Sequence, residues 1–406
     1  AIAIGAARGG GPQPVVIVLP GIMGSHLQRN GDRVWFDPLA IAMGGLKKIA
    51  WTPESLAKVS AEKLFELFYA DLCRHLAQSH RVVPYPYDWR RPVQHAAQGL
   101  AKVLREALAE TRAAGLPVRI VAHSMGGLVT RAMAAAEPAL WDEFLDREGS
   151  RFLMLGTPNQ GSHLMVEMLI GKGDTLRKLT MLQGGDLQDT LDLVAGFRGA
   201  LQLLPRPGFR DGGTPIDDYL REPVWQDLKP KVFDFWFGNF RVAVPPQAVC
   251  DEARALWDLP EFKSPRIPGG HSAKVIYVCG KAENTPCGIT LAGDRVKMIG
   301  TPEGDGSVSW ASGRIDGIGE AYLMDAAHGD LAATAEHFDA LMQLLADGAT
   351  DRLPRGWPGA AVRGEAPPAA VIYDAGPATV PTDEEAARSL LGATERRPRP
   401  RRATPA

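Results

Sequence analysis

The sequence has little cysteine and almost no net charge. Its 406 residues include only Cys73, Cys250, Cys279 and Cys287, without a CxxC pair, so neither a disulfide framework nor a zinc site is indicated. Cys279 and Cys287 are close enough in sequence to pair across a short loop, and two reduced thiols are an equal alternative. The formal net charge of -2 argues against nucleic acid as the main partner, because phosphate binding needs concentrated positive charge.

Long apolar runs and targeting signals are also missing. No run approaches the roughly 20 residues needed to span a bilayer. Residues 1–11 lack the basic and apolar regions of a signal peptide, which favours a cytoplasmic location. Since residue 1 is not methionine, we also expect that the chain is trimmed or part of something longer. Residues 44–48 lack the full phosphate-loop pattern and the histidines lack metal-ligand spacing, so we expect no cofactor and no metal.

The hydrophobic pattern indicates alternating strands and helices. Buried strands are predicted at residues 15–19, 81–85, 118–122, 151–155 and 273–279, and helices at 62–75, 93–114, 125–136 and 331–346. This alternation predicts an α/β fold with a mainly parallel sheet that is flanked by helices.

The alternation of predicted strands and helices is interrupted once, which predicts an insertion. Residues 12–160 are expected to form the first part of the core and residues 273–350 its remainder. Residues 161–272 are rich in Gly, Pro and aromatic residues without a βα pattern, and we interpret them as a cap. Residues 354–406 are rich in Pro, Ala and Arg, a composition typical of a disordered tail or linker, beyond which a further domain is conceivable.

Ser124 has the sequence context of a nucleophile. The segment 118–128 reads as a strand, a tight turn centred on Ser124 and an immediate helix, which is the context of a nucleophile elbow. Small residues must flank such a turn; Gly126 fits, and Ala122 stands where glycine is usual. The positive end of the following helix favours an oxyanion at the serine.

A base and an acid are expected after the nucleophile, in the order serine, acid, histidine. Among the later histidines, His337 falls inside a predicted helix and His271 precedes a strand, whereas His328 lies in a loop beside glycine. We therefore predict His328 as the base. Asp305, between two glycines, is a candidate for the acid, and Glu303, Asp294 and Asp316 compete with it.

An oxyanion hole needs two backbone amides near the serine. One is predicted to be that of Met125, the residue after the nucleophile. The Gly-rich segment 19–25 after the first strand supplies the other, with Ile22 preferred and Met23 as the alternative.

Several motifs together resemble one family of α/β-hydrolases. They are Leu-Pro-Gly-Ile-Met-Gly-Ser at 19–25, Tyr-Asp-Trp-Arg at 87–90, Ala-His-Ser-Met-Gly-Gly at 122–127, Gly-Thr-Pro at 156–158 and Gly-Asp-Gly-Ser-Val at 304–308. In this order, over residues 14–346, they resemble the lecithin:cholesterol acyltransferase-like branch, which includes lysosomal phospholipase A2 and phospholipid:diacylglycerol acyltransferases. The resemblance implies the α/β-hydrolase fold, a triad of Ser124, Asp305 and His328, an acyl-serine intermediate and a lipid ester as acyl donor. Residues 87–90 are expected to buttress the site.

The expected cap contains a dense group of aromatic residues. Trp225, Trp236 and Phe237 belong to it and are candidates for an acyl-chain pocket or for peripheral contact with a membrane; a small cap core is the equal alternative.

The predicted function is that of a serine hydrolase or acyltransferase acting on lipid esters, of the phospholipase A or O-acyltransferase type. A carboxylesterase or deacylase for smaller or protein-linked esters is the second interpretation. A non-catalytic binding module in a larger protein is the third.

Overall fold

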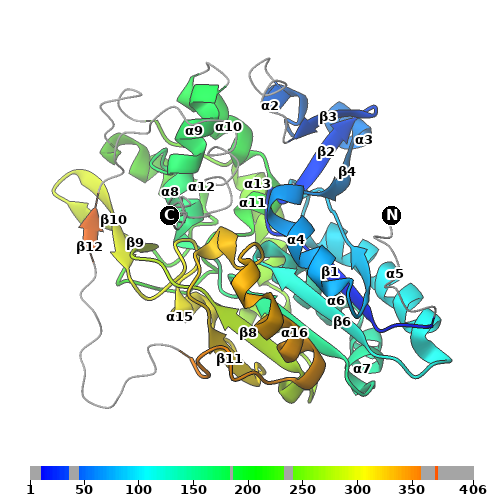
Figure 1. Ribbon diagram of the computed structural model, residues 1–406. Helices are drawn as coiled ribbons and strands as arrows, with labels where there is room; N and C mark the ends of the chain where they lie inside the picture. Colours follow the sequence, from blue (N-terminus) through cyan, green and yellow to red (C-terminus); the bar gives the residue numbers. More distant parts are fainter. Residues whose placement is uncertain (1–10, 36–44, 183–185, 233–240, 358–370, 374–406) are drawn as a thin grey trace, which may run out of the picture.

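Short apolar runs form a six-stranded sheet at the centre of the protein (Figure 1). The computed structural model describes residues 11–35, 45–182, 186–232, 241–357 and 371–373. The strand order is β11-β8-β7-β6-β1-β5, and every neighbouring pair is parallel. The strands are β1 (Val15–Leu19), β5 (Arg81–Pro84), β6 (Val118–His123), β7 (Arg151–Leu155), β8 (Val275–Cys279) and β11 (Glu320–Leu323). Residues of β1, β6 and β8 are buried on both faces, as the strands of a parallel sheet usually are.

Helices cover both faces of this sheet. On one face α4 (Glu66–Leu76) contacts α16 (Phe338–Asp347); on the other, α5 (Val93–Arg112), α6 (Met125–Ala136) and α7 (Pro138–Asp146) pack together (Figure 1). The longest of them, α5, buries an apolar stripe at helical spacing that includes Val93, Leu100 and Leu104. The sheet with its two helical layers is the α/β-hydrolase arrangement that the sequence predicts.

Two predicted helices begin later than the apolar spacing suggested. Residues 59–64, which overlap the helix expected at 62–75, form strand β4 (Val59–Leu64), because they pair antiparallel with β2 (Ser25–Arg29). The last helix begins at Phe338 rather than at residue 331, after the 3₁₀ turns η3 (His328–Asp330) and η4 (Ala335–His337).

Two small antiparallel sheets flank the central one. One contains β2, β3 (Asp32–Trp35) and β4, beside α2 (Gly45–Lys48) and α3 (Pro53–Lys58). The other contains β9 (Thr285–Ala292), β10 (Arg295–Thr301) and β12 (Val371–Tyr373). Short α15 (Trp310–Gly313) follows this second sheet in the chain order before β11.

The chain between β7 and β8 is mostly helical. Its elements are α8 (His163–Leu169), α9 (Asp174–Leu182), α10 (Leu187–Ala195), α11 (Arg198–Leu201), α12 (Glu222–Leu228), η1 (Lys229–Lys231), α13 (Gln247–Trp257), α14 (Pro260–Lys263) and η2 (Ser272–Lys274). This segment reaches the carboxyl ends of the strands, since a Cβ on Gly199 of α11 would lie 3.0 Å from the Met125 methyl carbon. Its assignment as a cap stays a prediction.

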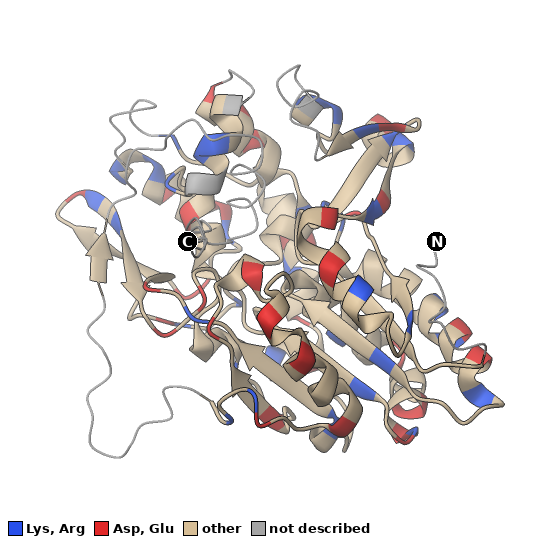
Figure 2. Ribbon diagram, in the orientation of Figure 1, with Lys and Arg blue, Asp and Glu red and all other residues tan. Residues whose placement is uncertain are grey.

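Part of the expected tail is structured. The amide of Leu323 donates to the carbonyl of Pro354, and that of Gly356 donates to Ala321 O. Trp357 packs on Tyr277 with ring centroids 5.1 Å apart, so one aromatic residue anchors a Pro-rich segment that composition alone assigns to disorder. Figure 2 shows acidic and basic residues interspersed along the helices and loops, in line with the near-zero net charge.

Candidate active site

Ser124 lies where the strand order of the sheet reverses. From β1 the chain continues to β5 on one side and then to β6 on the other, so the loops after β1 and β6 diverge at their carboxyl ends. Such a switch point in a parallel sheet leaves a crevice in which ligands bind. Ser124 directly follows β6, and residues 20–24 directly follow β1.

The turn at Ser124 is strained in the way a nucleophile elbow requires. Its φ of 53° and ψ of -123° are sparsely populated for a residue with a side chain, and α6 begins at the next residue. Gly126 makes the turn possible, because a Cβ there would lie 2.8 Å from Pro20 O and 2.9 Å from Leu19 Cβ. The Ser124 hydroxyl does not cap α6, which leaves it available to another partner.

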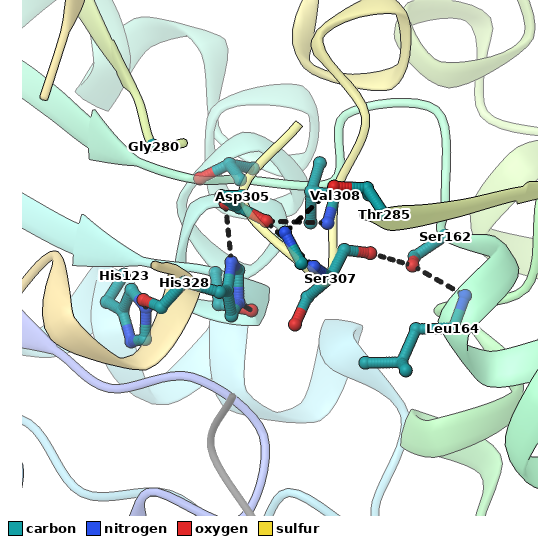
Figure 3. Close-up of polar contacts among 12 residues, drawn as sticks. His123, Ser162, Leu164, Gly280, Thr285, Asp305, Ser307, Val308 and His328 are labelled. Atoms are coloured by element: carbon teal, nitrogen blue, oxygen red, sulfur yellow. Dashed lines mark hydrogen bonds and ion pairs between the residues drawn. The ribbon is translucent and has the colours of Figure 1, made fainter. Parts of the chain in front are cut away.

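The structure brings Ser124, His328 and Asp305 into one hydrogen-bonded chain. Ser124 Oγ lies 2.8 Å from His328 Nε2. On the other side of the ring, His328 Nδ1 lies 2.7 Å from Asp305 Oδ2 (Figure 3). Since a carboxylate only accepts, Nδ1 carries the proton, and Nε2 is left to accept from the serine hydroxyl. All three side chains are buried, with Ser124 5% and Asp305 2% exposed. This is the geometry of a nucleophile, a base and an orienting acid.

The loop that carries Asp305 is held from several sides. Asp305 Oδ1 accepts from the amides of Ser307 (3.0 Å) and Val308 (2.7 Å), and the amide of His328 donates to the Asp305 carbonyl (2.8 Å). Ser162, at the start of α8, donates to the Ser307 carbonyl, as Figure 3 shows. Thr285 Oγ1 accepts from the amide of Gly306 (2.9 Å). The Asp305 carboxylate and its loop are therefore held in place by the protein itself.

Glycines let the strand ends approach this acid–base pair closely. A Cβ on Gly156, which has a φ of 57°, would lie 2.8 Å from Asp305 Oδ2 and 3.0 Å from His328 Nδ1. A Cβ on Gly280 would lie 2.7 Å from Asp305 Cβ. The Gly-Thr-Pro motif at 156–158 thus has a packing reason, which the sequence alone did not reveal.

The expected oxyanion loop lies against Ser124. A Cβ on Gly21 would be 2.9 Å from Ser124 Cβ, and Met23 has a φ of 61°. Within the described part of the chain, the backbone amides of Ile22, Met23 and Met125 have no hydrogen-bond acceptor. Two such amides near one serine are what an oxyanion hole needs. Their assignment to that role remains a prediction.

His123 is a site residue that the motifs contain but whose role they did not reveal. Its Nε2 lies 2.9 Å from the His328 carbonyl oxygen and its Nδ1 lies 2.8 Å from the hydroxyl of Tyr69. Burial, and secondarily the proximity of His328, lowers the pKa of His123 to about 3, so this imidazole is neutral at physiological pH. The His-Ser pair in the elbow was the available sequence signal.

Residues 87–90 begin beside the loop after β1, and the buttressing role expected for them stays a prediction. Tyr87 donates to the Pro20 carbonyl (2.8 Å), beside the oxyanion loop. Arg90 is fully buried, and its guanidinium donates two hydrogen bonds to the Asp88 carboxylate, at 2.8 and 2.6 Å. The Trp89 ring packs edge-on against Trp35 and Phe197.

Of the three aromatic candidates for substrate binding, the structure describes one. Trp225 is fully buried and donates to the Tyr219 carbonyl (2.8 Å), which fits the interior of the expected cap, whereas Trp236 and Phe237 lie outside the described residues.

The competing acids and histidines do not join the chain of hydrogen bonds. His271 lies 3.0 Å from Asp142, before β8. His337 ends η4 instead of lying inside a helix, and Asp294 and Asp316 are exposed. The four cysteines are buried free thiols, Cys279 and Cys287 included.

Residues 42–206 match the family described as lecithin:cholesterol acyltransferase, which confirms the resemblance carried by the motifs. The matched range contains the Tyr-Asp-Trp-Arg, elbow and Gly-Thr-Pro motifs; residues 19–25, Asp305 and His328 lie outside it. The match supports an enzyme that hydrolyses or transfers lipid acyl esters.

The solved structures to which this chain is similar include two lipases and a phospholipase. A mature lipase from Bacillus licheniformis is 15% identical over 85% of this chain and 97% of its own, with a TM-score of 0.37. A soluble variant of Saccharomyces cerevisiae monoglyceride lipase is 13% identical over 85% and 90%, with a TM-score of 0.37. The phospholipase PlaB from Legionella pneumophila is 14% identical over 67% and 40%, with a TM-score of 0.31. A search of curated proteins gave no match.

No helix among the described residues is both long and apolar enough to cross a membrane. Nor do the described residues contain a group of three or more His, Cys, Asp or Glu side chains placed to hold a metal ion.

Proposed function

From the match of residues 42–206 to the lecithin:cholesterol acyltransferase family, we propose that this protein transfers acyl groups from a lipid ester through an acyl-Ser124 intermediate. The observation that carries the proposal is the hydrogen-bonded chain from Ser124 through His328 to Asp305. A binding module would have no need to keep a strained serine, a base and a fixed acid in this arrangement.

The first half of the reaction forms the acyl-enzyme. Ser124 Oγ attacks the ester carbonyl carbon while His328 Nε2 takes the hydroxyl proton. The negative charge that develops on the carbonyl oxygen is accepted by the amides of Met125 and of Ile22 or Met23. As the tetrahedral intermediate collapses, His328 gives its proton to the departing alcohol oxygen, and the acyl group remains on Ser124.

The second half is the same chemistry with another nucleophile. Water or an acceptor alcohol attacks the acyl carbon, His328 takes its proton, and Ser124 leaves as the restored hydroxyl. Attack by water yields a free fatty acid, and attack by an alcohol yields a new ester. Asp305 stabilises the imidazolium in both halves, because its Oδ2 accepts from His328 Nδ1.

The decisive experiment compares wild type with Ser124→Ala on phosphatidylcholine liposomes and on a short-chain p-nitrophenyl ester, with and without a lipid alcohol. We expect serine-dependent release of fatty acid that the alcohol diverts into a new ester. Ser264→Ala, at an exposed position, is the matched control and should keep full activity. Activity on the short ester alone would favour a general esterase. If the protein turned over neither substrate, the fold would stand and the proposed acyl transfer would be wrong.

A further inference from the structure

A buried chain of hydrogen bonds runs behind Ser124 and links the two sides of the site. The amide of Gly21 lies 2.9 Å from the Tyr69 hydroxyl, and this hydroxyl lies 2.8 Å from His123 Nδ1. His123 Nε2 then lies 2.9 Å from the His328 carbonyl oxygen. One end of the chain is therefore the loop after β1, and the other is the backbone of the predicted base.

The chemistry of the groups allows one proton arrangement along this chain. The His328 carbonyl can only accept, so His123 Nε2 must carry a hydrogen, and in the neutral ring Nδ1 is then the acceptor. Tyr69 then donates its hydroxyl hydrogen to Nδ1 and accepts from the amide of Gly21 with its oxygen. Every donor and acceptor is satisfied, which is what buried polar groups require.

We propose that Tyr69 and His123 are positioning residues. Together they fix the loop that contains Gly21 and the backbone of His328 relative to each other, on either side of Ser124. The inference rests on the proposed function, since it assigns these residues to the same reaction. Neither side chain touches the reacting atoms. His123 acts through the His328 carbonyl, and Tyr69 acts through the amide of Gly21.

The surroundings of the two rings suit this role. Tyr69 is 1% exposed and His123 2% exposed, so bulk water does not compete for their hydrogen bonds. The His123 and His328 rings lie 4.9 Å apart between centroids (Figure 3). A neutral His123 adds no positive charge beside His328 when that residue takes the serine proton. The His328 amide is bound to the Asp305 carbonyl at the same time, so its backbone is held on both sides.

Tyr69→Phe removes the hydroxyl and keeps the ring. We expect kcat on a p-nitrophenyl ester to fall by about 10- to 100-fold, because small displacements of catalytic groups have effects of this size. KM should change by less than about twofold, since the chain does not face the substrate. The rate of labelling by a fluorophosphonate, which reports on Ser124 without a natural substrate, should fall in parallel with kcat.

Variants of His123 test the direction of the hydrogen bonds. His123→Leu removes both ring nitrogens and should reduce kcat at least as much as Tyr69→Phe. His123→Gln returns an amide N–H near the position of Nε2 and should recover part of the loss. Because the chain acts as a unit, the double variant of Tyr69→Phe and His123→Leu should be no worse than His123→Leu alone.

Tyr85→Phe is the matched control. The Tyr85 hydroxyl donates to the Ala96 carbonyl (2.7 Å) in the packing between β5 and α5, so its loss should lower Tm and leave kcat unchanged. If Tyr69→Phe likewise lowered Tm while kcat and labelling stayed at the wild-type level, or if KM rose in place of a fall in kcat, the positioning role would be wrong and the proposed function would stand. A folded wild type that the probe does not label would overturn the proposed function, and the positioning role with it.

Discussion

At the residue scale, the two carboxylate oxygens of Asp305 have separate tasks. Oδ1 accepts from two backbone amides, those of Ser307 and Val308, and this fixes the carboxylate plane. Oδ2 accepts from His328 Nδ1 and so selects the imidazole tautomer that leaves Nε2 free for Ser124. Neither oxygen of Asp305 can be replaced by an NH₂ group without losing a hydrogen bond, because both oxygens accept from N–H groups.

Asp305→Asn is therefore expected to reduce kcat strongly without unfolding the protein. Its amide NH₂ must face either the backbone amides or His328 Nδ1, and the second arrangement favours the wrong tautomer. A loss on the order of 10³- to 10⁴-fold in kcat is the usual size for this change in serine triads. Steady-state turnover of a p-nitrophenyl ester measures it, with the exposed Asp325→Asn as control. Near-normal turnover by Asp305→Asn would remove Asp305 from the proposed triad.

Sequence reasoning reached some of these residues and not others. Ser124 is marked by its own neighbours, and His328 could be selected because the alternatives fell on a predicted helix or before a strand. Tyr69 could not be found in this way. Its partner His123 is 54 residues away, and no local pattern marks a helix residue whose hydroxyl will meet a strand end.

At the element scale, the junction of β6 and α6 depends on how closely α6 approaches β1. A Cβ on Gly126 would meet Pro20 O and Leu19 Cβ at 2.8 and 2.9 Å, and neither atom belongs to a flexible side-chain end. Gly126→Ala must therefore push α6 and β1 apart. We expect it to reduce the free energy of unfolding by about 1–3 kcal/mol, the usual cost of overpacking, and to reduce turnover by moving the oxyanion loop.

Urea denaturation and ester turnover, measured on the same samples, test this expectation. Gly270→Ala is the control, because a Cβ at that exposed glycine would meet no atom within 4 Å. A Gly126→Ala protein with wild-type stability would mean that the junction tolerates a methyl group, as it does at Ala122.

Elements made from local apolar runs were predictable, and those that depend on distant partners were not. The strand at residues 151–155 and the helix at 125–136 have the predicted bounds, since their own sequence fixes their period. Residues 62–64 were expected to begin a helix, but pairing with β2 makes residues 59–64 a strand. Leu331 was expected to begin the last helix. Instead it packs beneath Gly156 and Gly280 as part of the loop that carries His328.

At the scale of the whole molecule, the fold brings together three loops that are far apart in the sequence and carry the residues of the site. Ser124 and His328 are 204 residues apart, and His328 follows β11 while Asp305 follows the β9–β10 hairpin. The order serine, acid, histidine was predictable from the fold class. The way in which Ser162 of α8 supports the acid loop was not, because no pattern in residues 161–272 indicates which of them reach the sheet.

Buried neutral histidines make the stability of the whole molecule depend on pH. Burial lowers the pKa of His163 and His123 to about 3, and burial together with Arg119 lowers that of His80 to about 4. The unfolded chain takes up protons at these positions below its pKa of 6.5, whereas the folded protein does not. The unfolded state is thereby favoured as the pH falls below 6.5, by up to about 1.4 kcal/mol per pH unit for each histidine.

His163→Phe isolates one of these contributions. His163 is 2% exposed, its Nε2 has no partner among the described residues, and its ring lies edge-on to Tyr219, so an aromatic replacement fits without a lost hydrogen bond. The free energy of unfolding from urea denaturation at pH 7.5, 6.0 and 5.0 should fall for both proteins, and less steeply for the variant. Altered packing would shift all three values equally, so the change in slope is the diagnostic quantity. Parallel slopes would show that His163 does not remain neutral in the folded protein over this range.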